Sequence, residues 1–69
     1  MWRVRKGNEY WVATQEDGLI ELWARSPENL LKMVQRIADD DLKTRKCLGL
    51  NHLIRKLEIT IGRRKRGKV

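Results

Sequence analysis

The sequence lacks most of the features on which disulfide bonding and metal binding depend. It has one cysteine, Cys47, and one histidine, His52, among 69 residues. A single cysteine cannot form an internal disulfide, which fits a protein of a reducing compartment. We expect Cys47 to be a small hydrophobic residue of the core. A single histidine with no second ligand at a suitable spacing does not predict a metal site. We therefore expect His52 to face solvent or cap a helix, and we expect no metal or cofactor.

Catalytic and membrane-inserting patterns are missing as well. The chain has no Gly-rich phosphate loop, no nucleophile with a base in view, and no catalytic constellation of paired carboxylates beyond a solvated acidic run. We therefore predict that the protein is not an enzyme. No segment is apolar enough to span a membrane, and residues 1–20 lack a secretory pattern. The expected location is the cytoplasm, with nucleoid association if the partner is DNA.

The length of the chain predicts one small domain, residues 1–62, followed by a basic tail, residues 63–69. Five of the seven tail residues are basic and none is large and apolar, which predicts disorder when the protein is free. A domain of this size buries only about 60% of its unfolded surface. Its stability should therefore be marginal unless a partner or a homodimer adds to it.

The positive charge is concentrated in one half of the chain. The whole sequence has a formal net charge of +7. Residues 1–41 hold six Lys or Arg and eight Asp or Glu, whereas residues 42–69 hold ten basic residues and one acid, Glu58. The halves thus carry −2 and +9. This asymmetry favours a polyanionic partner, above all nucleic acid, over a simple solubilising role.

The first half of the chain predicts a three-stranded antiparallel meander. Residues 2–5, 10–15 and 19–25 read as strands, since they alternate or are rich in β-branched and aromatic residues. Residues 6–9 contain Gly7 and Asn8, and residues 16–18 end in Asp-Gly; both are turn signals. The simplest fold is α+β, with the meander packed on one main helix.

The main helix is predicted at residues 26–38. Ser26 can cap its first N–H groups, Pro27 suits the first helical position, and Glu28 places an acid at the positive end of the helix. Apolar residues follow at three- and four-residue spacing and form one stripe that should cover a face of the sheet. The stripe consists of Leu30, Leu31, Val34, Ile37 and Ala38.

The second half of the chain is harder to assign. Asp40 or Asp41 should cap a short helical piece at 42–48, which ends at Gly49. Beyond it, residues 50–57 have helical spacing, whereas Leu57, Ile59 and Ile61 alternate as in a strand. A helix at 51–57 followed by an extended segment at 58–62, which would make a fourth strand, satisfies both patterns. Periodicity alone leaves helix and strand open here.

Alternation along the strands separates two faces of the predicted sheet. Trp2, Val4, Val12, Ile20 and Leu22 make a plausible core under the helix. Trp11 and Trp23 would then lie beside arginines on the outer face, where they could stack on bases or enter a groove. The alternative is that both tryptophans pack under the C-terminal segment or at a dimer interface.

Residues 2–38 resemble two families of DNA-binding domains. The first-strand arginines Arg3 and Arg5, the Trp-Val-Ala at 11–13 and the Ser-Pro-Glu at 26–28 are similar to features of the DNA-binding domain of ethylene-response transcription factors. They are also similar to the arm-binding domain of tyrosine recombinases. The resemblance implies a sheet that lies in the DNA major groove and reads bases from its outer face. Residues 42–58 also resemble a helix-turn-helix.

The sequence therefore predicts a small basic nucleic-acid-binding protein, with DNA favoured over RNA, that serves as a regulator or architectural accessory of a mobile element. The candidate binding residues are Arg3, Arg5, Trp11, Trp23, Arg25, Lys43, Arg45, Lys46, Arg55, Lys56, Arg63, Arg64, Lys65, Arg66 and Lys68. The alternative is a protein-binding module, such as a phage-type inhibitor that docks on a host nucleic-acid machine through its acidic half.

Overall fold

Three strands are followed by three helices in the structure, a computed structural model that describes residues 1–66. The elements are β1 (Trp2–Lys6), β2 (Trp11–Gln15), β3 (Glu21–Ala24), α1 (Pro27–Asp40), α2 (Leu42–Cys47) and α3 (Leu50–Arg66). The strands form an antiparallel sheet in the order β1-β2-β3, which confirms the predicted α+β class and the meander. In this part of the chain, no helix is both long and apolar enough to cross a membrane.

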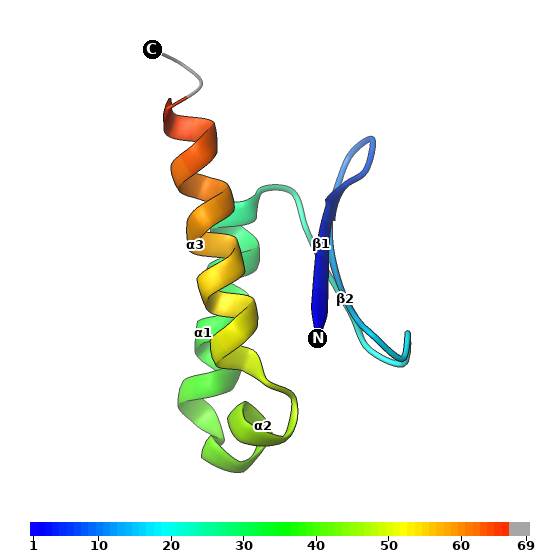
Figure 1. The fold of residues 1–69 in the computed structure, drawn as a ribbon, viewed down its shortest axis with the longest axis vertical. Helices are drawn as coiled ribbons and strands as arrows, with labels where there is room; N and C mark the ends of the chain where they lie inside the picture. The colour runs from blue at the N-terminus through cyan, green and yellow to red at the C-terminus, as the bar shows by residue number, and fades with distance from the viewer. Residues whose placement is uncertain (67–69) are drawn as a thin grey trace.

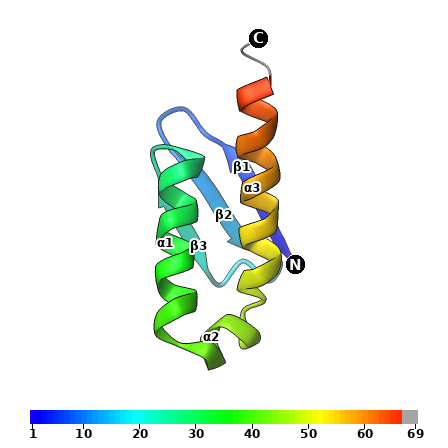
Figure 2. The same cartoon turned by 90° about the vertical axis from the view of Figure 1, so that its left-hand side faces the viewer.

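The fold has two layers (Figure 1). The sheet forms one layer, and α1 and α3 form the other, running in opposite directions side by side with α2 joining them at one end (Figure 2). Within residues 1–66, all three helices lie on the same side of the sheet. The opposite face of the sheet is therefore open, and it is called the outer face below.

The core lies between these layers. Small residues of the sheet, Ala13 and Ala24, are almost fully buried and let the helices approach closely. The indole of Trp2 is buried too, and its Nε1 donates to the Leu48 carbonyl oxygen at 2.6 Å. The helices supply Leu30, Val34 and Ala38 from α1 and Leu50, Leu53 and Leu57 from α3. The predicted α1 stripe is confirmed, with Leu31 and Ile37 packed at its margin.

The helix termini follow the predicted capping residues. Ser26 is the N-cap of α1, and its Oγ accepts from the Asn29 N–H at 3.1 Å. Asp41 closes α1 and caps α2, accepting from the N–H groups of Lys43 and Thr44. Gly49, between α2 and α3, has φ +63°, a left-handed conformation that glycine adopts without a steric penalty. Cys47 is exposed, so the expectation of a core cysteine is wrong.

The expected extended segment at 58–62 is helical, and the structure places no fourth strand within residues 1–66. The reason is that α3 packs along α1, so that its side chains are buried with the period of a helix and not with the alternation of a strand. Leu57 is buried, but Ile59, which the strand pattern would place on the same side, is 48% exposed. The helix also includes residues 63–66, for which the charge pattern predicts a disordered tail; residues 67–69 lie outside the described residues.

The predicted faces of β1 and β3 agree with the structure, but that of β2 is reversed. Val4 pairs with Ala13 and Ala13 with Leu22, so these three side chains share the inner face. Val12 pairs with Arg5 and Trp23 instead, and therefore lies on the outer face. Val12 is nonetheless 7% exposed, because its neighbours on that face cover it.

Candidate nucleic-acid interface

The open face of the sheet carries two arginines and a tryptophan. Arg3 pairs with Thr14, and Arg5 pairs with Val12, which in turn pairs with Trp23. Residues directly opposite one another in an antiparallel ladder point to the same face. Arg3 and Arg5 are exposed, and Trp23 is 53% exposed. β1 and β3 therefore present basic and aromatic side chains outward, as their alternation predicts.

Trp11 does not belong to this surface. Its partner across the sheet is Ala24, a core residue, so Trp11 lies on the inner face and packs against the core. The guanidinium of Arg64 lies over its ring, 5.5 Å from the centroid. The two tryptophans thus have different environments: Trp23 faces outward, whereas Trp11 packs under the C-terminal helix. Trp11 is therefore unavailable as an outward stacking platform.

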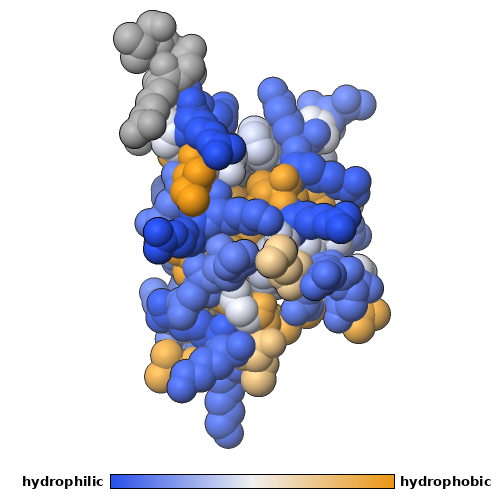
Figure 3. All heavy atoms as spheres, viewed as in Figure 1, coloured by the Kyte–Doolittle hydropathy of each residue, from blue (hydrophilic) through white to orange (hydrophobic). Residues whose placement is uncertain are grey.

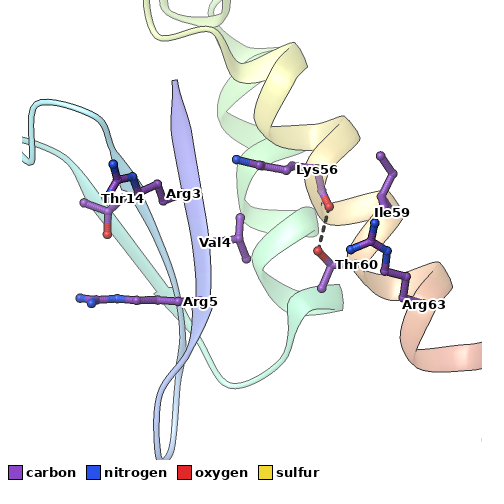
Figure 4. A pocket seen from close by; sticks show the side chains of 8 residues that line it. All are labelled: Arg3, Val4, Arg5, Thr14, Lys56, Ile59, Thr60 and Arg63. Carbon is purple, nitrogen blue, oxygen red and sulfur yellow. Dashed lines mark hydrogen bonds between the residues drawn. The ribbon is translucent and has the colours of Figure 1, made fainter. Parts of the chain in front are cut away.

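A basic groove runs beside the free edge of β1, between that strand and α3, with a volume of 740 Å³ (Figure 4). Its positive side chains come from two elements, Arg3 and Arg5 from β1 and Lys56 and Arg63 from α3. Val4, Thr14, Ile59 and Thr60 complete the lining, which contains no carboxylate. Of the two salt bridges found among the described residues, neither involves Arg3, Arg5 or Arg63. Their charges are free to meet an anion.

The groove follows both sides of the strand edge. Lys56 extends from α3 toward β1, and Val4 points into the space between them, while Arg3 and Arg5 lie on the far side of β1 (Figure 4). The Lys56 ammonium donates to the Trp2 carbonyl oxygen at 2.5 Å, which fixes the cation at the strand edge. Hydrophobic side chains are visible between α3 and the sheet on an otherwise mostly hydrophilic face (Figure 3).

A second depression, the aromatic hollow, lies on the outer face beneath the β1–β2 turn and has a volume of 530 Å³. The rings of Tyr10 and Trp23 line it, with centroids 5.8 Å apart and planes tilted by 57°. Its other lining residues are Arg5, Lys6, Gly7, Asn8, Glu9 and Val12. The turn favours glycine at position 7, because a Cβ there would lie 3.0 Å from the Tyr10 carbonyl oxygen, which is a tight contact.

Sequence reasoning did not single out Lys6 or Tyr10 as site residues. The available signal was the position of Tyr10 directly after the turn, next to the strand that carries Trp11. Alternation could not show that the Tyr10 ring meets Trp23, because that contact crosses from the turn to β3. The hollow is thus a product of the tertiary fold.

The other predicted residues are distributed over several surfaces. Arg25 is exposed just after β3, and Arg55 is exposed on α3, where with Glu58 it lines a depression next to Arg63. On α2, Lys43 and Lys46 are exposed, and Arg45 donates to the Asn51 side chain at 2.6 Å. In Figure 1, α2 lies at the opposite end of the molecule from the C-terminal end of α3. Lys65 and Arg66 belong to α3, and Lys68 lies outside the described residues.

The structure shows no group of metal-ligating side chains in the part of the chain that it describes. Residues 1–66 contain no group of three or more His, Cys, Asp or Glu side chains that could hold a metal ion. His52 is exposed, as expected. No protein-family model, curated protein or solved structure matches the chain. The basic groove and the aromatic hollow are therefore the candidate sites.

Proposed function

We propose that the protein binds nucleic acid, with DNA favoured over RNA. We further propose that it acts as a small regulatory or architectural accessory of a mobile element. The observation that carries this proposal is the basic groove. Four cations line it, two from β1 on the outer side of the strand edge and two from α3 on the inner side, and no acid is among the lining residues. A row of cations at a concave surface is complementary to a chain of phosphates.

The mechanism is phosphate neutralisation. Each phosphate contacted by a Lys or Arg releases condensed counterions, so that log affinity for duplex DNA falls with log salt by about 0.9 per contact. Such contacts position the protein and carry little sequence information. The preference for DNA comes from the resemblance in residues 2–38. It gains support from an outer sheet face that no helix within residues 1–66 covers and that carries Arg3 and Arg5.

Binding can be tested by fluorescence anisotropy with duplex DNA, single-stranded DNA and structured RNA over a range of salt concentrations. The double variant Arg3→Ala/Arg63→Ala removes two groove cations. Lys32→Ala/Arg36→Ala is the matched control, because it removes the same charge from exposed positions on α1. We expect the first variant to reduce the salt slope by about two and the control to leave it nearly unchanged. Equal effects of both variants would mean that only net charge matters.

A second candidate function is docking on a protein. β3 is an edge strand, and the exposed acids Glu16, Asp17 and Glu21 lie at or near it. Such an edge can accept an added strand, and the acids would favour a basic partner surface. No measurable binding of the wild-type protein to any nucleic acid at low salt would rule out the first function and favour this one.

A further inference from the structure

The aromatic hollow and the basic groove share one residue, Arg5. Its side chain lines both depressions, because the groove extends around the edge of β1 onto the outer face, where the hollow lies. The two sites are therefore continuous: cations line one side of the strand edge, and aromatic rings lie next to it on the outer face. A ligand with alternating anionic and flat aromatic parts would match this order of side chains.

The two ends of the hollow carry charges of opposite sign. Arg5 and Lys6 lie on the β1 side, whereas Glu9 lies in the turn and adds a carboxylate to the lining. This carboxylate disfavours a phosphate inside the hollow, while the neutral rings of Tyr10 and Trp23 favour an uncharged aromatic group. A phosphate is better placed toward Arg5 and the groove, where no acid lines the surface.

We propose that the aromatic hollow receives one unpaired base of single-stranded DNA, while the adjoining phosphates lie along Arg5 and the basic groove. This inference rests on the proposed nucleic-acid binding and adds which form of nucleic acid is bound. In a duplex the bases stack on one another and expose only their edges in the grooves. The face of a Trp ring can therefore stack on an unpaired base without the cost of separating two stacked base pairs.

The volume and accessibility of the hollow fit this ligand. Its 530 Å³ lies within the range of about 300–1,000 Å³ that small-molecule sites occupy. The Trp23 ring packs beside Tyr10, yet 53% of Trp23 is exposed. The tyrosine therefore holds the ring on one side while solvent reaches the rest of it. Stacking of this kind tolerates different bases, because every base has a π face.

The test compares an oligothymidylate with a blunt-ended duplex that has no unpaired bases and carries the same number of phosphates, at one salt concentration. Wild-type protein should bind the single strand at least about fivefold more tightly, which is the lower limit expected for one stacked base. Binding of the single strand should also quench tryptophan fluorescence and protect it from acrylamide. Both wild-type measurements are independent of whether any variant folds.

Variants of Trp23 then assign the effect to the hollow. Trp23→Ala should weaken single-strand binding about 5- to 150-fold, with little change for the duplex. Trp23→Phe keeps an aromatic face and should retain most of the affinity, which separates stacking from a general loss of structure. Arg5→Ala should weaken binding of both probes, because Arg5 contacts phosphates.

Two outcomes would overturn the inference, and they differ in what else they affect. Equal wild-type affinity for both probes, with Trp23→Ala changing neither or changing both alike, would exclude the stacked base and leave nucleic-acid binding intact. Failure of the wild-type protein to bind any nucleic acid at low salt would overturn the inference together with the proposed function.

Discussion

Arg64 of α3 holds its guanidinium over the ring of Trp11 in β2, 5.5 Å from the ring centroid. The same guanidinium forms a salt bridge with Glu28 in the first turn of α1, with an N–O distance of 3.3 Å. One side chain near the C-terminal end of α3 thus joins both layers of the fold. Although the sequence assigns residues 63–69 to a tail, Arg64 is part of the domain.

This relationship predicts opposite behaviour for two neighbouring arginines. Arg64→Ala removes the cation–π contact and the exposed salt bridge, and should lower the free energy of unfolding by about 1 kcal/mol. Arg63→Ala removes the same charge from the basic groove, and should change stability by less than about 0.5 kcal/mol while weakening nucleic-acid binding more. Urea denaturation and anisotropy measure the two effects.

Glu28→Gln serves as the control, since it removes the salt bridge and keeps the stacking. Its loss of stability should be smaller than that of Arg64→Ala. If Arg63→Ala were the more destabilising of the two arginine variants, the contact between Arg64 and Trp11 would not contribute as described. By the same reasoning, deletion of residues 63–69 should destabilise the domain, contrary to what the charge pattern alone predicts.

The sequence predicts the elements of the sheet better than their faces. In β1 the alternation of Trp2 and Val4 with arginines is unambiguous, and the structure agrees with it. In β2 the run Trp11, Val12 and Ala13 is apolar throughout, so alternation cannot decide which residues face the helices. Register decides it, and a slip of one residue reverses every side chain. The consequence for function is that Trp23, but not Trp11, is available to a ligand.

The end of the chain shows a second limit. Leu57, Ile59 and Ile61 fit a strand when considered alone, and only packing against α1 shows that the segment is helical. The candidate site depends on this packing. As part of α3, Lys56 and Arg63 lie across the edge of β1 from Arg3 and Arg5, so that one groove is lined by residues some 50 positions apart in the printed sequence. Local periodicity contains no information about such a pairing.

The N-cap of α1 gives a second prediction. Because the Ser26 Oγ accepts from the Asn29 N–H at 3.1 Å, Ser26→Ala should lower the free energy of unfolding by about 1 kcal/mol. Ser26→Asp supplies another capping acceptor and should retain stability. Chemical denaturation followed by circular dichroism measures both variants. An unchanged midpoint in Ser26→Ala would show that the cap does not stabilise α1.

Asp41 gives a prediction about pH. The Thr44 hydroxyl, which donates to its carboxylate at 2.8 Å, and the N–H groups of Thr44 and Lys43 lower the pKa of Asp41 below 3.8. A lowered pKa means that the ionised form stabilises the folded state. This contribution is fully present above pH 3.8 and is lost as the pH falls through the lowered value.

Thr44→Val removes the largest of these causes and should raise the pKa of Asp41 toward 3.8. An NMR titration of the Asp41 carboxyl carbon measures the shift directly. The stability difference between the wild type and Thr44→Val should be constant above pH 3.8 and shrink below it. An Asp41 pKa that is the same in both proteins would contradict the hydrogen bond from Thr44.

Lys56 and Arg55 provide the last prediction, because they are adjacent cations with different environments. The Lys56 ammonium donates to the Trp2 carbonyl oxygen at 2.5 Å across the basic groove, whereas Arg55 is exposed on α3. Lys56→Met keeps the apolar stem and removes the donor. It should lower the free energy of unfolding by about 1.5 kcal/mol, the lower end of the range for bonds to charged groups, because water can reach the freed carbonyl.

Arg55→Met is the matched control, with the same replacement, the same loss of charge and a change in stability of less than about 0.5 kcal/mol. Urea denaturation of both variants separates loss of the hydrogen bond from loss of charge. The groove also predicts a difference in binding: Lys56→Met should reduce the salt slope for DNA by about one, and Arg55→Met by less. Equal stabilities of the two variants would mean that Lys56 does not secure the edge of β1. Equal salt slopes of the two variants would mean that the phosphate path extends beyond the groove onto the exposed face of α3.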